Sequence, residues 1–403
     1  MTNFFISIII SILLTSNSFS IEKITTNQKI KKTEQLLVEA ANNISEGKIE
    51  AALIIVKNLI DINPNFKLAH MIYGDLLLIQ SHNYDQVSAD THKQYKKKIY
   101  DLKLELSRRI ESFNNLDKNL IGSKIKALLA KDIKYLIFID VKSSRLFSFS
   151  NNEGKLKYIS DYYMSVGKKG YGKKFEGDKK TPIGTYFIKN KITSKLPDLY
   201  GVGAYSLNFP SAYDRINNFT GSGIWIHGTP SSTYSRPPQS SDGCIVLSNE
   251  DINELAYILN ESGTPVIISD TGLSIISGRD SSDIVMSKNE ILKKIQGWKS
   301  SWEEKDTEKY LKYYSDMARY NNDSYPKWTA HKRNVFKKSQ GIQIKIEDIS
   351  FFEYPGNDED LILVKFKQIY SSNLLKNEMI KQQIWTKKDS GWSIIYEGAF
   401  KFI

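Results

Sequence analysis

Residues 135–149 read YLIFIDVKSSRLFSF, and this stretch decides the fold of the middle of the chain. Two short runs rich in β-branched and aromatic residues, 135–140 and 145–149, flank the turn-forming Lys142-Ser143-Ser144. Such a pair predicts two antiparallel strands. Similar runs follow, bounded by Gly, Lys, Asp and Ser, at 158–166, 184–189, 223–226 and 265–269. We therefore predict a mostly antiparallel β domain over residues 131–271. Its one clear helix, 249–260, has Ser248 or Asn249 as the N-cap.

The region before this domain has a helical pattern. Between Thr33 and Ala130, small and apolar residues recur as in one tetratricopeptide-type (TPR-like) helical hairpin, without a convincing second copy. One hairpin buries too little surface to be stable alone. We therefore expect it to pack on the next helix, about residues 91–113, or on a second copy of the chain. The sequence predicts a helical domain over residues 21–130, and a homodimer through these helices is one alternative.

The region after the β domain changes character twice. Residues 272–287 are rich in Ser, Gly and Asp, which predicts a linker. Beyond it, an amphipathic helical stretch at 288–314 precedes strand-like runs at 342–352, 360–371, 379–387 and 392–400. A helix followed by a curved antiparallel sheet indicates an α+β domain over residues 288–403. Its aromatic residues either hold a ligand or, more commonly, fill a core or a dimer contact: Trp298, Trp302, Tyr313, Tyr314, Trp328 and Trp392.

The first twenty residues predict export. Residues 4–14 are apolar but too short to span a bilayer, and Ser18 and Ser20 supply the small side chains that precede a cleavage site. We expect a signal peptide at 1–20 and a periplasmic protein. An uncleaved anchor is the alternative, because no Lys or Arg precedes the apolar run. The net charge of +11 permits attraction to anionic polymers, but no nucleic-acid recognition motif is present, so we expect no nucleic-acid partner.

Cys244 is the only cysteine in 403 residues, and His227 precedes it by a long loop and a turn. A thiol with an imidazole nearby is a candidate nucleophile with its base, although an inert buried thiol is the alternative. Gly243 allows a tight turn before the thiol, so the amides of Gly243 and Cys244 are candidate donors to an oxyanion. The carbonyl of Gly228 can orient the ring of His227, with Asp242, Asp214 and Ser241 as rivals.

A metal site is a weaker alternative. The other histidines lie in other predicted segments, which makes a set of three or four ligands hard to assemble. They are His70, His82, His92 and His331. We expect no metal and no cofactor. The loop 229–240 is dominated by Ser, Thr and Pro and is suited to wall a cleft, in which Tyr234 and Arg236 are candidate substrate contacts.

Three ordered blocks give the central region a resemblance to a known family. They are Gly177-Asp178-Lys179-Lys180-Thr181-Pro182-Ile183-Gly184-Thr185-Tyr186, Gly223-Ile224-Trp225-Ile226-His227-Gly228 and Ser241-Asp242-Gly243-Cys244-Ile245. Residues 135–270 resemble the catalytic domain of the L,D-transpeptidase family, also called the YkuD family. In that family a cysteine on a β-sandwich-like domain attacks the L-to-D amide bond of a peptidoglycan stem peptide. The resemblance implies Cys244 as the nucleophile, His227 as the base and Gly228 as the carbonyl that orients it, with Gly243, Ser241 and Asp242 in support.

Two positions depart from the family pattern. Asp242 stands where many members have His, and Val246 stands where many have Arg, so the group that binds the substrate carboxylate is unassigned. Arg236, Lys173 and Lys174 are the candidates. The departures resemble a branch in which a domain similar to SnoaL and nuclear transport factor two follows the catalytic one. That branch includes L,D-carboxypeptidases that trim stem tetrapeptides and affect cell shape.

The resemblance implies a multidomain protein: a helical TPR-like region, a YkuD-type β-sandwich and a SnoaL-like α+β cone. It implies an exported cysteine acyl-transfer enzyme whose partners are stem peptides, acting as L,D-transpeptidase or L,D-carboxypeptidase. Two alternatives remain open. One is a non-catalytic envelope scaffold, and the other is an amidase that releases a protein from its diaminopimelate link.

Overall fold

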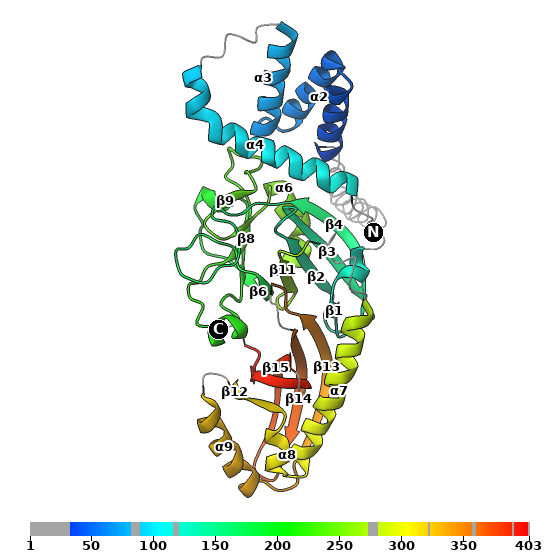
Figure 1. Cartoon of the computed structure of the whole chain (residues 1–403), viewed down its shortest axis with the longest axis vertical. Coiled ribbons are helices and arrows are strands. Elements are labelled where there is room, and N and C mark those ends of the chain that lie inside the picture. Colours follow the sequence, from blue (N-terminus) through cyan, green and yellow to red (C-terminus); the bar gives the residue numbers. More distant parts are fainter. Residues whose placement is uncertain are drawn as a thin grey trace, which may run out of the picture.

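The computed structural model describes residues 33–81, 89–115, 121–272, 281–320, 323–356, 360–388 and 391–401. Three parts follow one another along the long axis of the molecule: helices at one end, a β domain in the middle, and a curved sheet with helices at the other end (Figure 1). This is the predicted multidomain order. The predicted signal peptide lies outside the described residues. Within the described ranges, no helix has the length and apolar character needed to cross a membrane.

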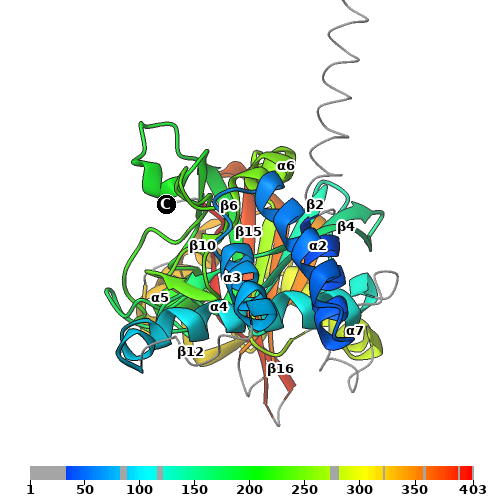
Figure 2. The ribbon, with the colours of Figure 1, turned by 90° about the horizontal axis from the view of Figure 1, so that it is seen from above.

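The N-terminal part is helical throughout its described residues. Residues 33–45 form a helix, followed by α2 (Ile49–Ile62), α3 (Lys67–Ser81) and α4 (Ala89–Asn115). α2 and α3 share a small apolar core that includes Val56, Leu59 and Phe66. α4 crosses between these helices and the β domain, and the helices lie over that domain when seen from above (Figure 2). The helix predicted near 91–113 is confirmed as α4, and the tetratricopeptide detail stays a prediction.

Residues 121–130, predicted as the end of the helical domain, do not form an α-helix. They form a 3-10 turn, η2 (Ile121–Lys124), and the short strand β1 (Ala127–Leu128), which pairs with β13 (Gln343–Glu353) of the C-terminal sheet. Their apolar side chains belong to a core shared by the middle and C-terminal parts. The chain is therefore attached to the C-terminal sheet before it enters the middle domain.

The middle domain is built, in its described residues, on an eight-stranded sheet of order β10-β8-β7-β6-β11-β2-β3-β4. All neighbours are antiparallel except the β10–β8 and β11–β2 pairs. The strands are β2 (Tyr135–Asp140), β3 (Arg145–Asn152), β4 (Lys155–Tyr163), β6 (Gly184–Lys191), β7 (Ala204–Leu207), β8 (Trp225–His227), β10 (Ile245–Val246) and β11 (Pro265–Ser269). A second, two-stranded sheet joins β5 (Val166–Gly167) to β9 (Gln239–Ser241).

Both faces of the large sheet are buried. Ile137 and Ile139 belong to one core, which α6 (Asn249–Leu259) covers, whereas Leu136 and Phe138 belong to the other. Successive strand residues face opposite sides, so a continuous apolar run is what a strand covered on both faces requires. The second core includes aromatic side chains of the C-terminal sheet. The C-terminal part therefore covers the face of the sheet opposite α6.

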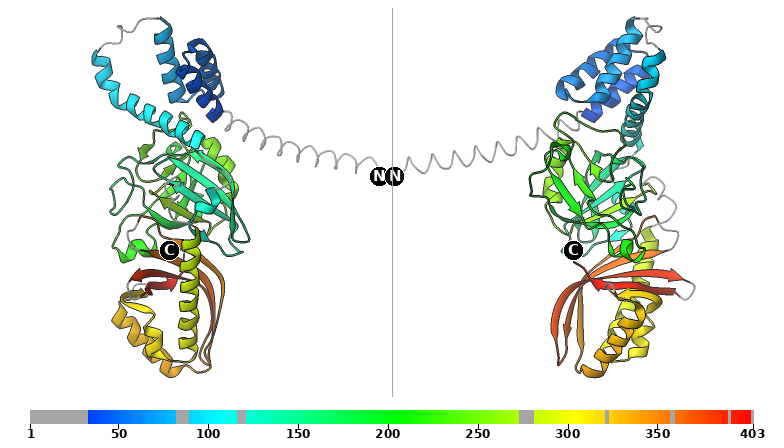
Figure 3. Two further views of the ribbon diagram at one scale, coloured as in Figure 1. Left: turned by 45° about the vertical axis from the view of Figure 1, so that its right-hand side comes forward. Right: turned by 90° about the vertical axis from the view of Figure 1, so that its left-hand side faces the viewer.

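The C-terminal part, as described, contains a six-stranded sheet of order β1-β13-β14-β15-β16-β12. The long strands curve around α7 (Figure 3). The remaining elements are α7 (Ser281–Glu303), α8 (Thr307–Leu311), β12 (Tyr314–Tyr320), α9 (Tyr325–Lys338), β14 (Leu361–Ser371), β15 (Lys376–Lys388) and β16 (Gly391–Ala399). The four predicted strand runs are confirmed. The single helix predicted over 288–314 is wrong in its bounds: α7 begins inside the predicted linker and ends at Glu303, and β12 follows α8 directly.

The aromatic residues of this part pack inside the cone. Trp298, Trp302, Tyr314, Trp328 and Trp392 are all buried in one core, and Tyr313 packs against it. Large aromatic side chains bury much apolar area and stabilise a core strongly. All six residues therefore belong to this core or pack against it, and Trp302 also lines a cavity of the cone.

Candidate active site

The pairing of β8 with β10 places the thiol and the imidazole on one face of the sheet. Ile226 is the partner of Ile245 and His227 is the partner of Val246, so Cys244, just before β10, is level with Trp225. Ile226 and Ile245 are fully buried in the core. Because side chains alternate along a strand, Cys244 and His227 both face away from that core. They are diagonal neighbours on adjacent strands, a relation that brings side chains within reach of each other.

The imidazole of His227 is buried and oriented by a backbone carbonyl. It is 3% exposed, and its Nδ1 lies 2.7 Å from the carbonyl oxygen of Gly228. A carbonyl only accepts hydrogen bonds, so Nδ1 carries the proton and Nε2 is left as the unprotonated base. The edge of the ring also contacts Tyr200, with 5.0 Å between ring centres. Burial lowers the pKa of His227 to about 4, so the ring is neutral near pH 7.

The rival orienters have other partners. The carboxylate of Asp214 accepts a hydrogen bond from the N–H of Ser211 and caps α5 (Ala212–Ile216). The carboxylate of Asp242 is exposed and pairs with Lys168 at 2.6 Å. Gly228 is therefore the group that holds the ring of His227.

The thiol of Cys244 is protonated in the resting state. Its Sγ–H donates to the carbonyl of Gly223 at 3.4 Å. Burial raises the pKa of the thiol above its ordinary value, and the nearby Asp242 adds to this. A backbone hydrogen bond from Trp225 and the positive charges of Arg236 and Lys173 act in the opposite direction without reversing it. A partly buried neutral thiol on the same sheet face as a neutral imidazole needs that imidazole as its base.

The turn before the thiol is held by Ser241. The hydroxyl of Ser241 accepts the N–H of Gly243 at 3.1 Å and donates to the carbonyl of Cys244 at 2.6 Å. The Gly243 amide is therefore not free for an oxyanion, contrary to the sequence prediction, because its hydrogen is already used inside the turn. The Cys244 N–H donates to no acceptor in the described part of the chain, which leaves it as the candidate oxyanion donor.

Gly243 leaves no room for a side chain. Its φ is +127°, and a Cβ would lie 2.8 Å from the carbonyl oxygen of Lys180. We expect Gly243→Ala to cost about 1–3 kcal/mol of folding free energy and to slow labelling of Cys244, because the turn that carries the thiol must shift. Gly263→Ala is the matched control: its φ is +87°, but nothing lies within 4 Å of its Cβ position. Thermal unfolding and the rate of thiol labelling check this, and equal effects of the two substitutions would contradict it.

Arg236 is the basic candidate whose charge acts on the thiol and which forms no ion pair with a carboxylate of the described residues. Its positive charge acts on the pKa of both Cys244 and His227. Its Nη2 makes only a long contact with the carbonyl of Leu199, at 3.4 Å. Among the ion pairs of the described residues, none involves Arg236. A half-buried guanidinium that has no ion-pair partner, and whose charge acts on the nucleophile, is suited to bind a carboxylate.

Two other candidates for substrate contact, Lys173 and Lys174, have partners within the protein. Lys173 is buried, and its Nζ donates to the carboxylate of Asp178 and to the carbonyl of Phe175, both at 2.9 Å. Lys174 is exposed, and its ammonium lies 5.8 Å from the ring centre of Phe219. Lys173 therefore stabilises the loop that carries the first sequence block and acts on the thiol only through its charge.

Tyr234 was predicted as a substrate contact, and the structure contradicts this. It is 8% exposed and belongs to the core of the N-terminal helices, where its ring lies 4.8 Å from that of Phe66. Periodicity could not reveal this, because the partner lies far away in the sequence. A buried ring in another core cannot meet the substrate.

Sequence reasoning missed three residues that support the site. Thr181 donates to the carbonyl of Gly243 at 2.9 Å, and it lies in the first of the three sequence blocks, so that block carried a signal for it. Tyr163 and Ser165 both donate to the carbonyl of Arg236, each at 2.9 Å. No local pattern distinguished them, because these contacts join β4 and the residues after it to a loop more than 70 residues further along the chain.

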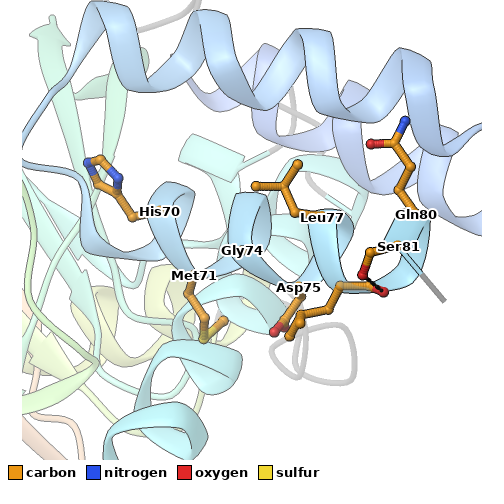
Figure 4. Close-up of a pocket in the computed structure, with 8 residues that line it drawn as sticks. His70, Met71, Gly74, Asp75, Leu77, Gln80 and Ser81 are labelled. Carbon is orange, nitrogen blue, oxygen red and sulfur yellow. Dashed lines mark hydrogen bonds between the residues drawn. The ribbon is translucent and has the colours of Figure 1, made fainter. Parts of the chain in front are cut away.

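The two most voluminous of the cavities found in the described residues lie away from the thiol. One, of about 790 Å³, is an open groove on α3 lined by His70, Met71, Gly74, Asp75, Leu77, Leu78, Gln80 and Ser81 (Figure 4). The other, of about 530 Å³, opens in the C-terminal part beside Trp302 and Lys332. Neither includes Cys244 or His227.

In the described residues, no group of three His, Cys, Asp or Glu side chains is arranged to hold a metal ion.

Comparisons with known proteins agree with this architecture. The profile of the L,D-transpeptidase catalytic domain (YkuD) matches residues 134–268, and that of the Cds6 C-terminal NTF2-like domain matches residues 290–398. Neither profile reaches the N-terminal helices. No curated protein matches the sequence.

Two solved structures have a similar fold. The helical cell shape determining protein Pgp2 from Campylobacter jejuni is 24% identical, with 69% of this chain and 96% of that chain covered and a TM-score of 0.56. Bd1075 from Bdellovibrio bacteriovorus is 27% identical, with 69% of this chain and 98% of that chain covered and a TM-score of 0.55. The predicted branch is thereby confirmed: the chain carries an L,D-transpeptidase catalytic domain of the YkuD family followed by a C-terminal NTF2-like domain.

Proposed function

We propose that this protein is an exported cysteine enzyme that acts on the L-to-D amide bond of peptidoglycan stem peptides through a thioester on Cys244. One observation carries the proposal. The only thiol of the chain shares a sheet face with a buried neutral imidazole, whose Nδ1–H is held by the carbonyl of Gly228. That arrangement leaves Nε2 of His227 as a base directed away from the core.

In the first half of the proposed reaction, His227 activates the thiol of Cys244. Nε2 of His227 takes the proton of the Cys244 thiol, and the thiolate attacks the amide carbonyl of the substrate. The C–N bond breaks, a thioester forms, and the leaving amine takes the proton from the imidazolium. Because burial lowers the pKa of His227 to about 4, the imidazolium is a strong acid and returns its proton readily to the amine. The N–H of Cys244 stabilises the negative charge on the carbonyl oxygen.

The acceptor in the second half decides the activity. Neutral His227 removes a proton from the acceptor, which attacks the thioester and releases the thiol. If the acceptor is water, the enzyme trims a stem peptide as an L,D-carboxypeptidase. If the acceptor is the amine of a neighbouring stem, the enzyme forms a cross-link as an L,D-transpeptidase.

Arg236 is proposed to bind a carboxylate of the stem peptide. Stem peptides carry free carboxylates, and the guanidinium, whose charge acts on the thiol, forms no ion pair with a carboxylate in the described residues. A bidentate pair with the substrate would orient the scissile bond toward Cys244. This assigns to Arg236 the role left open by Val246, which stands where many family members have arginine.

Two further features belong to the proposal. Acting on peptidoglycan places the enzyme in the periplasm, which is where the predicted signal peptide would send it. The name of Pgp2 describes that protein as determining helical cell shape. We propose a related role in cell shape for this chain.

Mass spectrometry of muropeptides tests the proposal. Purified protein is incubated with disaccharide tetrapeptides, and the products are compared with those of Cys244→Ala. Release of D-alanine identifies carboxypeptidase activity, and an L,D-linked dimer identifies transpeptidase activity. If wild-type protein forms neither product and a carbapenem fails to acylate Cys244, the enzyme proposal is wrong and the envelope scaffold replaces it.

A further inference from the structure

We infer that the N-terminal helices position the active-site loop 229–240 and thereby fix the place from which the charge of Arg236 acts on the catalytic thiol. The helices are then a positioning element of the active site. The inference rests on the proposed function only for the meaning of Arg236 in substrate binding. The contacts on which this inference rests join the catalytic domain to the N-terminal helices, which neither family profile reaches.

The loop residues just before Arg236 are held by the N-terminal helices. The N–H of Tyr234 donates to the carbonyl of Asn65 at 3.2 Å, and the ring of Tyr234 packs on Phe66. The hydroxyl of Ser235 donates to the carboxylate of Glu105 in α4 at 2.7 Å. Phe66 and Glu105 are both almost fully buried. Two consecutive loop residues are therefore held by the turn between α2 and α3 and by α4.

Earlier in the loop there is one more contact of this kind. The side-chain amide of Asn65 donates to the carbonyl of Ser231 at 3.3 Å. The segment before α3 thus contacts the loop at two points, through a side chain and through its backbone. A rigid-body shift of the loop would break both of these contacts together.

Arg109 of α4 supports Arg236 by a second route. Its guanidinium is 3% exposed, pairs with Glu105 at 3.0 Å and with Glu34, and lies 3.9 Å from the ring centre of Tyr163. The hydroxyl of Tyr163 donates to the carbonyl of Arg236. A buried charge pair tolerates little displacement, because each unpaired charge would then be without solvent. Both routes from α4 to Arg236 therefore have a defined geometry.

Arg236 depends on this support because its own side chain is weakly held. Its only described side-chain hydrogen bond is the 3.4 Å contact with Leu199, so the loop backbone determines where the guanidinium lies. A loosened loop would move the positive charge away from Cys244. If the helices only covered apolar surface of the β domain, loss of these contacts would leave the positive charge near Cys244 unchanged.

The charge at the thiol can be measured without any peptidoglycan. The rate of alkylation of Cys244 is compared for anionic iodoacetate and neutral iodoacetamide, and the ratio of the two rates reports the positive charge beside the sulfur. Arg236→Ala sets the ratio without that charge, and we expect it about three- to tenfold below wild type. We expect the ratio for Tyr234→Ala to fall most of the way to the value for Arg236→Ala. Tyr234→Phe keeps the ring on Phe66, so its ratio should stay at the wild-type value.

Two further variants separate positioning from general stability. Phe66→Ala removes the other half of the ring contact from the helical side and should lower the ratio as Tyr234→Ala does. Leu76→Ala truncates a buried residue of the same helical core, about 15 Å further along α3, and should leave the ratio unchanged. An unchanged ratio in Tyr234→Ala, or an equal fall in Leu76→Ala, overturns the inference. The thermal unfolding of each variant is recorded beside its ratio.

Kinetic measurements connect the positioning of loop 229–240 to substrate binding. If Arg236 binds the stem carboxylate equally in the ground and transition states, Tyr234→Ala should raise KM severalfold and change kcat little. A fall in kcat with unchanged KM contradicts this. Absence of muropeptide turnover in the wild-type protein would refute the proposed function and leave the alkylation result to stand or fall separately.

Discussion

Replacing Cys244 with alanine is expected to abolish turnover of muropeptides, with a fall in kcat of about 10⁴-fold or more. The substitution removes the only thiol in the chain, so no thioester can form and carbapenem labelling drops to zero. Folding should change by no more than about 1 kcal/mol, because the thiol has only weak sulfur hydrogen bonds, to the carbonyl of Gly223 at 3.4 Å and from the backbone of Trp225. Mass spectrometry of the intact protein and of the products measures both effects.

Cys244→Ser serves as the control for this prediction. It keeps the shape of the side chain and replaces sulfur by an oxygen that is far harder to deprotonate. Because the pKa of His227 is about 4, the imidazole is too weak a base to activate an alcohol well. We expect the serine variant to be nearly as inactive as the alanine variant. Substantial turnover by either one would show that the nucleophile lies elsewhere.

Replacing His227 with asparagine is expected to lower kcat by about 10²- to 10⁴-fold. The side-chain amide can still donate to the carbonyl of Gly228, as Nδ1 does, but no base remains at the position of Nε2. The variant therefore separates the orienting hydrogen bond from proton transfer. Single-turnover acylation of Cys244 by a carbapenem measures the loss. If His227→Asn acylates at the wild-type rate, another group deprotonates the thiol.

The pH dependence of the wild-type protein follows from the same histidine. The acid limb of kcat/KM should have its midpoint near pH 4, because burial lowers the pKa of His227 from 6.5 to about 4. The unfolded chain protonates this residue between pH 6.5 and 4 while the folded chain does not. Protonation of the unfolded chain therefore lowers the free energy of unfolding as the pH falls below 6.5. The loss amounts to about 3 kcal/mol at pH 4, whereas above pH 6.5 this histidine causes none.

His227→Asn is the control for the stability effect. Urea unfolding at pH 7 and at pH 4.5 should show a smaller drop for the variant than for the wild type, since asparagine does not titrate. An acid limb that remains near pH 6.5, or equal drops for both proteins, would contradict the low pKa.

Much of the β architecture is predictable because its signals are local. Residues 135–140 and 265–269 are apolar runs bounded by turn formers, and they are strands with those same bounds. Ser248 caps α6 because a serine before acidic residues is a local signal as well. β7 and β12 are different: their assignment depends on pairing with β6, β8 and β16, which no local pattern carries.

The chemical groups of the site were also readable from the sequence, but their states were not. The sequence allows Ser241 as an orienter of the ring, but in the fold its hydroxyl accepts the N–H of Gly243. Asp242 was considered beside it, and its carboxylate is drawn to the solvent-exposed Lys168. Both outcomes depend on where the turn lies relative to loops that come from elsewhere in the chain.

The sequence by itself determined which groups exist and in what order: one thiol, one histidine at the end of an apolar run, and a glycine at the turn between them. Three features depend on the three-dimensional fold: burial keeps the imidazole neutral, Tyr234 packs on the N-terminal helices, and the charge of Arg236 comes close enough to act on the thiol. The physical reason is range. Strand periodicity and turn chemistry act over a few residues, whereas burial and charge pairing arise where segments as distant as Glu105 and Ser235 meet.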